Sequence, residues 1–477
     1  MNDNFILGVD YYINPRHTVS FESKFNNVLS SENNSTIDYL VNEYHNESLV
    51  NSHSETQKSD GNGNGNYQSV FYIAQLSDND KLNLDATIST SNDDSRNDFY
   101  ENTIFEHTNI SDNKQNKFRF NSEFTHNINE KSSFNLGYGF YNLKSQNSFN
   151  ASNYTLKDNR HKLFGYYAVK PSKKIGVKVG VAGEVSTPEL SNKKLTYFIY
   201  QPYLDVKYNL SKKVDLKLKY RSNSNYPSLS EANPNTVFID NETESKGNPN
   251  LKPSVTHKIS VRSNILGGFL SLEPYYHFSN NYIGQIGKLR SDGIIEYNYD
   301  NVGSYRNYGV KGSIAFPLFK KKVFWQTSAN YYRSSIVYNG NKNAFNDVHL
   351  ESNLIYVNRK NALTSGFVFQ RGMNKRISTQ GFNKSNNDFL GFLVQKGFYK
   401  NKLNLMLLYM LPIDGSLDYI QSDYVSTPTF NRTTEYDINL LKNVFVFKLN
   451  YRFSKGKSTR KTAKDIQEDE KKKDGFF

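Results

Sequence analysis

The chain has 477 residues, of which 36% are hydrophobic, and its formal net charge at pH 7 is +13. No run approaches the roughly 20 apolar residues that a membrane-spanning helix needs, and the absence of cysteine excludes a disulfide framework and a thiolate metal site. The 35 tyrosines and 33 phenylalanines favour strands, because aromatic residues suit a pleated, half-buried surface.

Apolar and polar residues alternate from the beginning of the chain. Residues 5–12 are predicted as a strand that ends at the turn 14–16, and residues 19–25 as the next strand. The polar segments 30–66 and 91–116 are predicted as long loops. Because successive side chains of a strand point to opposite faces, an apolar face recurs with no helical pattern available to cover it.

The same unit repeats along the chain: a strand, a short turn, a second strand and a long polar loop. Short turns are predicted at residues 78–80, 129–131, 171–173, 211–213, 266–268, 319–321, 358–360 and 399–401. We count about nineteen strands, several near the 9–11 residues that cross a bilayer at a tilt. This organisation predicts an all-β fold, a large antiparallel transmembrane β-barrel over residues 1–453, with short periplasmic turns and long extracellular loops.

The strand predicted at residues 444–453 shows the alternation most clearly. Five residues with apolar or aromatic side chains, from Phe445 to Phe453, share one face that is predicted to meet lipid. The polar face of this strand, together with that of an earlier strand, is predicted to line the lumen; the candidates are Asp215, Lys217, Lys219, Arg221, Lys448, Asn450 and Arg452. Residues 454–477 are rich in charge and are predicted to form a flexible periplasmic tail.

Strand direction indicates that strands are missing. The first strand runs into a short turn and the last follows a long loop, so both head towards the periplasm and cannot close on each other in an antiparallel barrel. Bacterial single-chain barrels have even strand counts. An odd number of strands is therefore predicted to be missing from the N-terminus, and three would give about 22, the size of plugged outer-membrane transporters. Residues 1–7 also show no secretory signal, and the genomic sequence upstream of Met1 would decide both points.

A family resemblance rests on two strings between residues 220 and 253. They read Tyr-Pro-Ser-Leu-Ser-Glu-Ala from Tyr226 and Gly-Asn-Pro-Asn-Leu-Lys-Pro from Gly247. They resemble the loop signature of TonB-dependent outer-membrane receptors and, more closely, the outer membrane protein beta-barrel family of receptor-like proteins. The motif candidates are Tyr226, Pro227, Gly247, Asn248, Pro249, Leu251 and Pro253.

The resemblance implies uptake of an unknown small ligand across the outer membrane of a Gram-negative bacterium. It implies outer-membrane lipid and the barrel-assembly machinery as partners, the latter reading the Tyr451-Arg452-Phe453 ending. A plug domain and TonB would act through a missing N-terminal region, because the resemblance here covers the barrel portion alone. The strings also have a purely structural explanation: Gly247 permits a sharp reversal and Pro249 and Pro253 fix φ, so they shape an extracellular hairpin.

Patterns of catalysis or metal binding are weak. Residues 60–65 match the first half of a calcium loop, but Phe71 stands where the bidentate glutamate is required, so a flexible Gly/Asn loop is the preferred interpretation. The nine histidines show no metal-ligand spacing and no complete G-x-S-x-G elbow is present. We therefore expect no enzyme, no cofactor and no metal.

Three functions remain to be weighed. The first is the barrel of a TonB-dependent receptor that binds its ligand through extracellular loops and lumen. The second is a non-transporting surface barrel, an adhesin or structural protein. The third, a soluble basic protein that binds nucleic acid, is disfavoured because the positive charge is spread over turns and the tail rather than gathered on one element.

Overall fold

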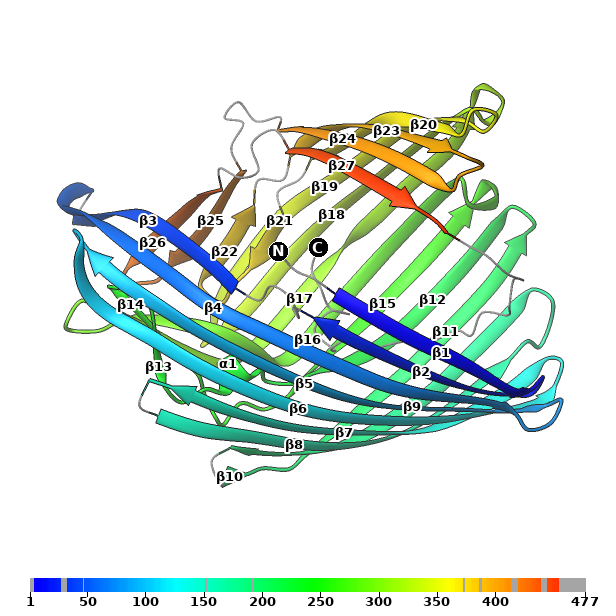
Figure 1. The fold of residues 1–477 in the computed structure, drawn as a ribbon, viewed down its shortest axis with the longest axis horizontal. Coiled ribbons are helices and arrows are strands. Elements are labelled where there is room, and N and C mark those ends of the chain that lie inside the picture. Colours follow the sequence, from blue (N-terminus) through cyan, green and yellow to red (C-terminus); the bar gives the residue numbers. More distant parts are fainter. Residues whose placement is uncertain are drawn as a thin grey trace.

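The computed structural model describes residues 4–26, 32–45, 47–150, 152–190, 193–371, 374–385, 388–412, 419–438 and 444–453. Its main feature is a curved antiparallel wall of strands, which Figure 1 shows curving round from β1 (blue) to β27 (red). No helix among the described residues is long and apolar enough to cross a membrane. The predicted tail, residues 454–477, lies outside the described residues.

The wall is one continuous series of antiparallel neighbours. Its strands are β1 (Asn4–Asn14), β2 (His17–Asn26), β4 (Ser48–Gln75), β5 (Asp80–Glu101), β6 (Ile104–Asn129), β7 (Ser132–Phe149), β8 (Ser152–Val169), β9 (Ile175–Leu190), β11 (Tyr197–Ser211), β12 (Val214–Asn225), β15 (Ser254–Ile265), β16 (Leu270–Leu289), β17 (Ile295–Leu318), β18 (Val323–Tyr338), β19 (Asn341–Asn358), β20 (Leu363–Arg371), β23 (Phe389–Phe398), β24 (Leu403–Pro412) and β27 (Val444–Tyr451). These nineteen strands confirm the predicted fold class and strand number. The sheet has 23 strands in all, because β3 (Glu32–His45), β10 (Lys193–Lys194), β13 (Thr236–Asp240) and β14 (Thr243–Lys246) extend it beyond the wall.

The connections differ at the two edges of the wall. At one edge lie the predicted short turns, two of which contain the 3-10 helices Leu266–Gly268 and Phe319–Lys321. At the opposite edge lie the longer connections, which carry α1 (Leu229–Ala232), the β13–β14 hairpin and a second sheet. The strands of this second sheet are β21 (Asn374–Ile377), β22 (Gly381–Ser385), β25 (Tyr419–Ser426) and β26 (Asn431–Ile438). This sorting identifies the short-turn edge as periplasmic and the other as extracellular.

The prediction of long polar loops at residues 30–66 and 91–116 is wrong. The first segment forms β3 and most of β4, and the second belongs to β5 and β6, which pair without interruption from Asp80↔His126 to Glu101↔Ile104 apart from one bulge. These hairpins extend past the apolar band and carry mostly polar residues on both faces, so the sequence shows no alternation to mark a strand. The calcium-like string 60–65 lies within β4, with Gly63 opposite Asp93, and an extended strand cannot wrap around an ion.

Alternation along the wall separates an outward apolar face from an inward polar one. On β9, Val179 and Val181 are exposed while Ala182 and Glu184 are buried. On β27, Leu449 is 57% exposed and lies opposite Leu405 of β24. An outward apolar band of this kind is the surface that a transmembrane barrel presents to the bilayer.

The packed core lies beneath the extracellular connections rather than at mid-wall. Ala232 of α1 packs against Tyr154, Leu156 and Leu190 on the inner face of β8 and β9. The β13–β14 hairpin reaches across the mouth: the amide of Asn109 on β6 donates to the carbonyl of Phe238 at 2.7 Å, while β14 pairs in parallel with β17. Because β6 and β17 are far apart in the wall, the hairpin spans the concave side.

The wall is not closed by any pairing among the described residues. β1 pairs with β2 alone and β27 with β24 alone. Both strands run towards the periplasmic edge, since β1 ends at the turn to β2 and Tyr451 of β27 lies opposite Leu403, next to the turn at 399–402. The predicted parallel orientation of the first and last strands is therefore present.

Candidate ligand-binding site

The segment 226–253, here called the motif segment, folds back against the inner wall and begins with α1. Ser228 caps this helix: its hydroxyl accepts from the Glu231 amide at 3.2 Å, and the Glu231 carboxylate accepts from the Ser228 amide at 2.6 Å. This reciprocal pair is a capping box, which explains the Ser-Leu-Ser-Glu order of the first string.

The second string of the motif segment packs directly on the first. The Gly247 amide donates to the carbonyl of Asn233 and the Asn248 amide to that of Glu231, both at 2.7 Å. A Cβ on Gly247 would lie 2.5 Å from the backbone N and O of Asn233. Glycine is therefore required here by the close approach of two backbone segments rather than by a left-handed φ.

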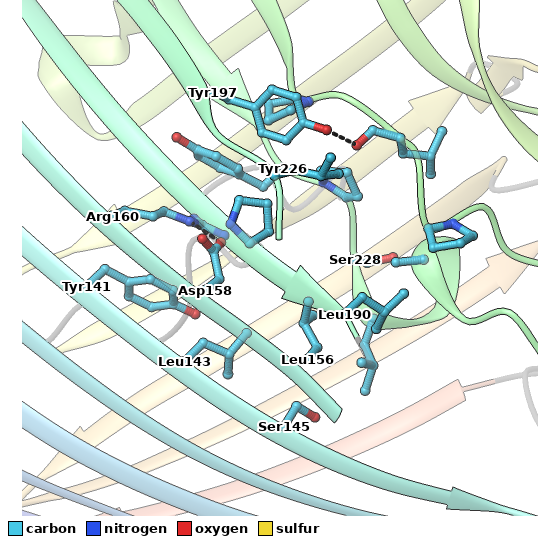
Figure 2. A pocket seen from close by; sticks show the side chains of 18 of the residues that line it. Tyr141, Leu143, Ser145, Leu156, Asp158, Arg160, Leu190, Tyr197, Tyr226 and Ser228 are labelled. Atoms are coloured by element: carbon cyan, nitrogen blue, oxygen red, sulfur yellow. Dashed lines mark hydrogen bonds and ion pairs between the residues drawn. The ribbon is translucent and has the colours of Figure 1, made fainter. Parts of the chain in front are cut away.

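A cavity of about 540 Å3 lies between the motif segment and the inner faces of β6 to β9. We call it the inner-wall cavity, and Figure 2 shows the side chains around it. Six of the seven motif residues line it: Tyr226, Pro227, Asn248, Pro249, Leu251 and Pro253. The seventh, Gly247, packs against the backbone of Asn233 instead. The Tyr197 hydroxyl donates to the Leu251 carbonyl at 3.3 Å and so joins β11 to the motif segment.

Arg160 of β8 is the buried charge of this cavity. Its guanidinium carbon lies 3.5 Å from the ring centroid of Tyr226 and 4.6 Å from that of Tyr141, and its Nε donates to Asp158 Oδ2 at 2.6 Å (Figure 2). The Ser186 hydroxyl donates to the other oxygen of Asp158 at 2.9 Å. Two aromatic faces and a carboxylate thus hold the guanidinium in place.

Tyr226 ties the motif segment to β9. Its hydroxyl donates to the Glu184 carboxylate, and burial together with that negative charge raises the pKa of Tyr226 well above its usual value. The hydroxyl therefore stays protonated and remains a donor.

The cavity as a whole is electropositive. Lys117, Arg119, Arg160 and Lys193 line it, and Asp158 is the single carboxylate among the lining residues. Histidine and glutamate do not line it, so its donor set is suited to an anion rather than to a metal ion.

The residues predicted to line the lumen are not among the described residues that line this cavity. On β12, Lys217 Nζ lies 3.1 Å from Asp205 of β11, and the Asn264 amide donates to Asp215 at 2.9 Å. Lys219 lies opposite Asp205 and Arg221 opposite Tyr203.

On β27, Lys448 and Asn450 lie opposite Met406 and Asn404, and the Arg452 amide donates to the Lys402 carbonyl at 2.7 Å. The described lining of the inner-wall cavity thus brings together motif residues and includes none of the lumen candidates.

The residues that the sequence did not reveal are those of the wall beneath the motif segment. Tyr141, Asp158 and Arg160 come from β7 and β8, and only the antiparallel register places them under Tyr226. The one signal available is the charged pair Asp158 and Arg160 at positions i and i+2, which share the inward face of a strand.

Comparisons with known proteins agree with this architecture. The model of the outer membrane protein beta-barrel family matches residues 74–410. A search of curated proteins finds no match. Among solved structures, the copper transporter OprC is 10% identical, with 95% of this chain and 72% of that chain covered and a TM-score of 0.68.

Two further receptors are also similar in fold. The pyoverdine outer membrane receptor FpvA from Pseudomonas aeruginosa PAO1 is 10% identical over 95% of this chain and 77% of its own, with a TM-score of 0.59. The siderophore receptor PirA from Pseudomonas aeruginosa is 11% identical over 87% and 78%, with a TM-score of 0.50. At these identities the likeness is one of fold.

Proposed function

Because the chain belongs to the outer membrane protein beta-barrel family, we propose that it forms the barrel of a receptor that takes up a small anionic ligand across the Gram-negative outer membrane. The observation that carries the proposal is the inner-wall cavity, in which the motif segment encloses about 540 Å3 lined by four cationic side chains and one carboxylate. One solved structure of similar fold is a siderophore receptor, which suggests a metal chelate as the ligand, and the charge of the cavity favours one that is negative.

The chemistry of the cavity suits such a ligand. Lys117, Arg119 and Lys193 supply donors and positive charge, and Tyr141 and Tyr197 supply aromatic surface. Arg160 has Asp158 as a partner and holds the Tyr226 ring and the wall in register, and the other three cations add positive charge to the same cavity. A preorganised pocket of this kind gains affinity because little has to be ordered on binding.

Uptake also requires strands that close the barrel wall and partners that supply the energy for transport. We infer that an odd number of further strands joins β1 to β27, and that a plug domain and TonB act on the lumen. The outward apolar band supports contact with outer-membrane lipid, and the exposed Phe453 at the end of β27 supports recognition by the barrel-assembly machinery.

The binding proposal is tested by titrating the purified chain, in detergent micelles, with a trianionic ferric tris-catecholate and with a cationic ferric hydroxamate complex. We expect saturable binding of the anion alone, weakened at least tenfold in Lys117→Ala/Arg119→Ala. The control is Lys212→Ala, at a periplasmic turn, which should bind as the parent does. Equal affinity for both complexes, or no effect of the double variant, would overturn the assignment of an anionic ligand.

Uptake is tested separately in the source bacterium by following radioactive iron carried by the same tris-catecholate. If the chain is an uptake receptor, a protonophore that dissipates the proton gradient of the inner membrane should abolish the accumulation of radioactive iron. A non-transporting surface barrel, which the long projecting hairpins β3–β4 and β5–β6 would also suit, would bind the complex and show no energy-dependent accumulation.

A further inference from the structure

A second polar cluster lies at the extracellular mouth, away from the inner-wall cavity. It consists of Glu43 of β3, His53 and Glu55 of β4, and Glu242 in the turn between β13 and β14. We call these four residues the mouth cluster. It joins two hairpins that are distant in the chain, at the point where β14 and β26 approach β3 and β4 in Figure 1.

The imidazole of His53 is the centre of the cluster. Its Nε2 lies 3.3 Å from Glu55 Oε1 and 3.4 Å from Glu242 Oε1. One ligand atom each from Glu43, His53 and Glu242 lie within 4.8 Å of one another. The Asn51 amide donates to Glu43 at 2.8 Å and lies 3.4 Å from His53 Nδ1, so the second ring nitrogen also has a polar neighbour that can orient the ring.

These separations are those of metal ligands. In a tetrahedral site with bonds of about 2.0–2.1 Å, neighbouring ligand atoms lie roughly 3.3–3.5 Å apart. The distances from His53 Nε2 to both glutamates already match two edges of such a tetrahedron.

The negative charge of the mouth cluster also favours a bound cation. His53 and Glu55 are only 6% and 3% exposed, and three carboxylates surround one imidazole. Asp240, the next acid, is already paired with Arg432 at 2.5 Å.

The turn that carries Glu242 also contains buried side-chain atoms without a hydrogen-bond partner among the described residues. Both amide atoms of the Asn241 side chain are buried without a partner among the described residues. Buried polar atoms of this kind destabilise a turn unless another interaction holds it.

We propose that Glu43, His53 and Glu242, with Glu55 beside them, bind a divalent transition-metal ion of the Zn2+ type and fasten the β13–β14 hairpin to the β3–β4 hairpin. Imidazole with carboxylates suits Zn2+ and its neighbours, whereas Ca2+ and Mg2+ prefer oxygen ligands alone. The site does not depend on the proposed uptake function. Its effect is on the extracellular mouth, which the β13–β14 hairpin crosses.

The alternative is an imidazolium of His53 held between Glu55 and Glu242 without a metal. This arrangement would use the same distances, but it would bind no Zn2+ and would not respond to a chelator. Metal titration therefore separates the two.

The first experiment is isothermal titration of the chelator-treated full chain, in detergent micelles, with Zn2+ and with Ca2+. We expect one Zn2+ per chain with a Kd at or below the micromolar range and no saturable Ca2+ binding. His53→Gln and Glu242→Gln should each weaken Zn2+ binding at least tenfold. Glu106→Gln, an exposed glutamate near the tip of the β5–β6 hairpin, is the matched control and should bind as the parent does.

The second experiment measures hydrogen exchange of the amides in residues 236–246 with Zn2+ and with chelator. Zn2+ should slow their exchange at least tenfold in the parent and in Glu106→Gln, and have no effect in Glu242→Gln. Heat-dependent mobility on a gel confirms that each variant is a folded barrel. Absence of saturable Zn2+ binding by the folded parent, cluster variants that bind Zn2+ as tightly as the parent does, or amide exchange that is the same with and without Zn2+ would each overturn the proposal.

Discussion

The Arg160 guanidinium is buried because three partners replace the water it loses. The rings of Tyr141 and Tyr226 cover its faces and Asp158 accepts its hydrogen bond. Breaking a buried pair from one side leaves the other charge uncompensated, so Arg160→Met should lower the free energy of unfolding by about 3–5 kcal/mol. Urea unfolding of the refolded barrel measures this effect.

Two further variants show whether charge is the cause. Arg160→Met combined with Asp158→Asn removes both charges and should recover a large part of the lost stability. Lys193→Met removes an exposed cation at the same cavity and should change stability by less than about 1 kcal/mol. Equal destabilisation by the single and the double variant would show that packing of the guanidinium, rather than the buried charge, is what matters.

A second prediction rests on the lack of space for a side chain at Gly247. A Cβ at this position would meet the backbone of Asn233 and Glu231, which cannot move as a side-chain end can. Gly247→Ala should therefore push the two strings of the motif segment apart and cost about 1–3 kcal/mol, with weaker binding in the inner-wall cavity. Gly312→Ala, where nothing lies within 4 Å of the added carbon, is the control for barrel stability, and equal effects of the two changes would contradict this explanation.

At the scale of single elements, β27 tests which face meets lipid. Leu449 is on the outward face opposite Leu405, and Asn450 is on the inward face opposite Asn404. Leu449→Arg should destabilise the barrel in lipid vesicles by about 2–4 kcal/mol if it lies near mid-depth, because the charge enters hydrocarbon. Asn450→Arg, one residue along, should cost little, and the reverse order of the two effects would invert the assigned faces.

The sequence predicts a strand well where one face is apolar and the other polar, and poorly where both faces are polar. Wherever one face is apolar and the other wet, as in the pairing of Leu405 with Leu449, alternation marks the strand and its register. In the outer parts of β4 to β6 both faces carry mostly polar residues, the alternation disappears, and strands are mistaken for loops. The same limit explains why the strings at Tyr226 and Gly247 identified the motif segment, whereas Arg160, which depends on pairing across β7 and β8, could not be found.

At the scale of the whole molecule, the extracellular connections form a second layer across the mouth. Arg432 of β26 contacts Asp240 of β13, and the Gly287 amide of β16 donates to Gln380 at 2.6 Å. The rings of Tyr39 on β3 and Tyr436 on β26 lie 6.3 Å apart. Elements from both ends of the wall therefore meet around the β13–β14 hairpin, and a metal at the mouth cluster would fasten this layer at one of its contacts.

The open seam between β1 and β27 gives the last prediction. Both strands run towards the periplasm, so an antiparallel barrel can close only if an odd number of strands from outside the described residues joins them. The chain has no cysteine, which makes disulfide scanning direct. Gly8→Cys combined in turn with a cysteine at each position from 446 to 452 should form no disulfide in barrels assembled in cells, whereas Asn404→Cys/Asn450→Cys, partners within the wall, should oxidise readily. A seam disulfide as efficient as this control would mean that β1 and β27 pair in parallel, and that nineteen strands close the barrel without help.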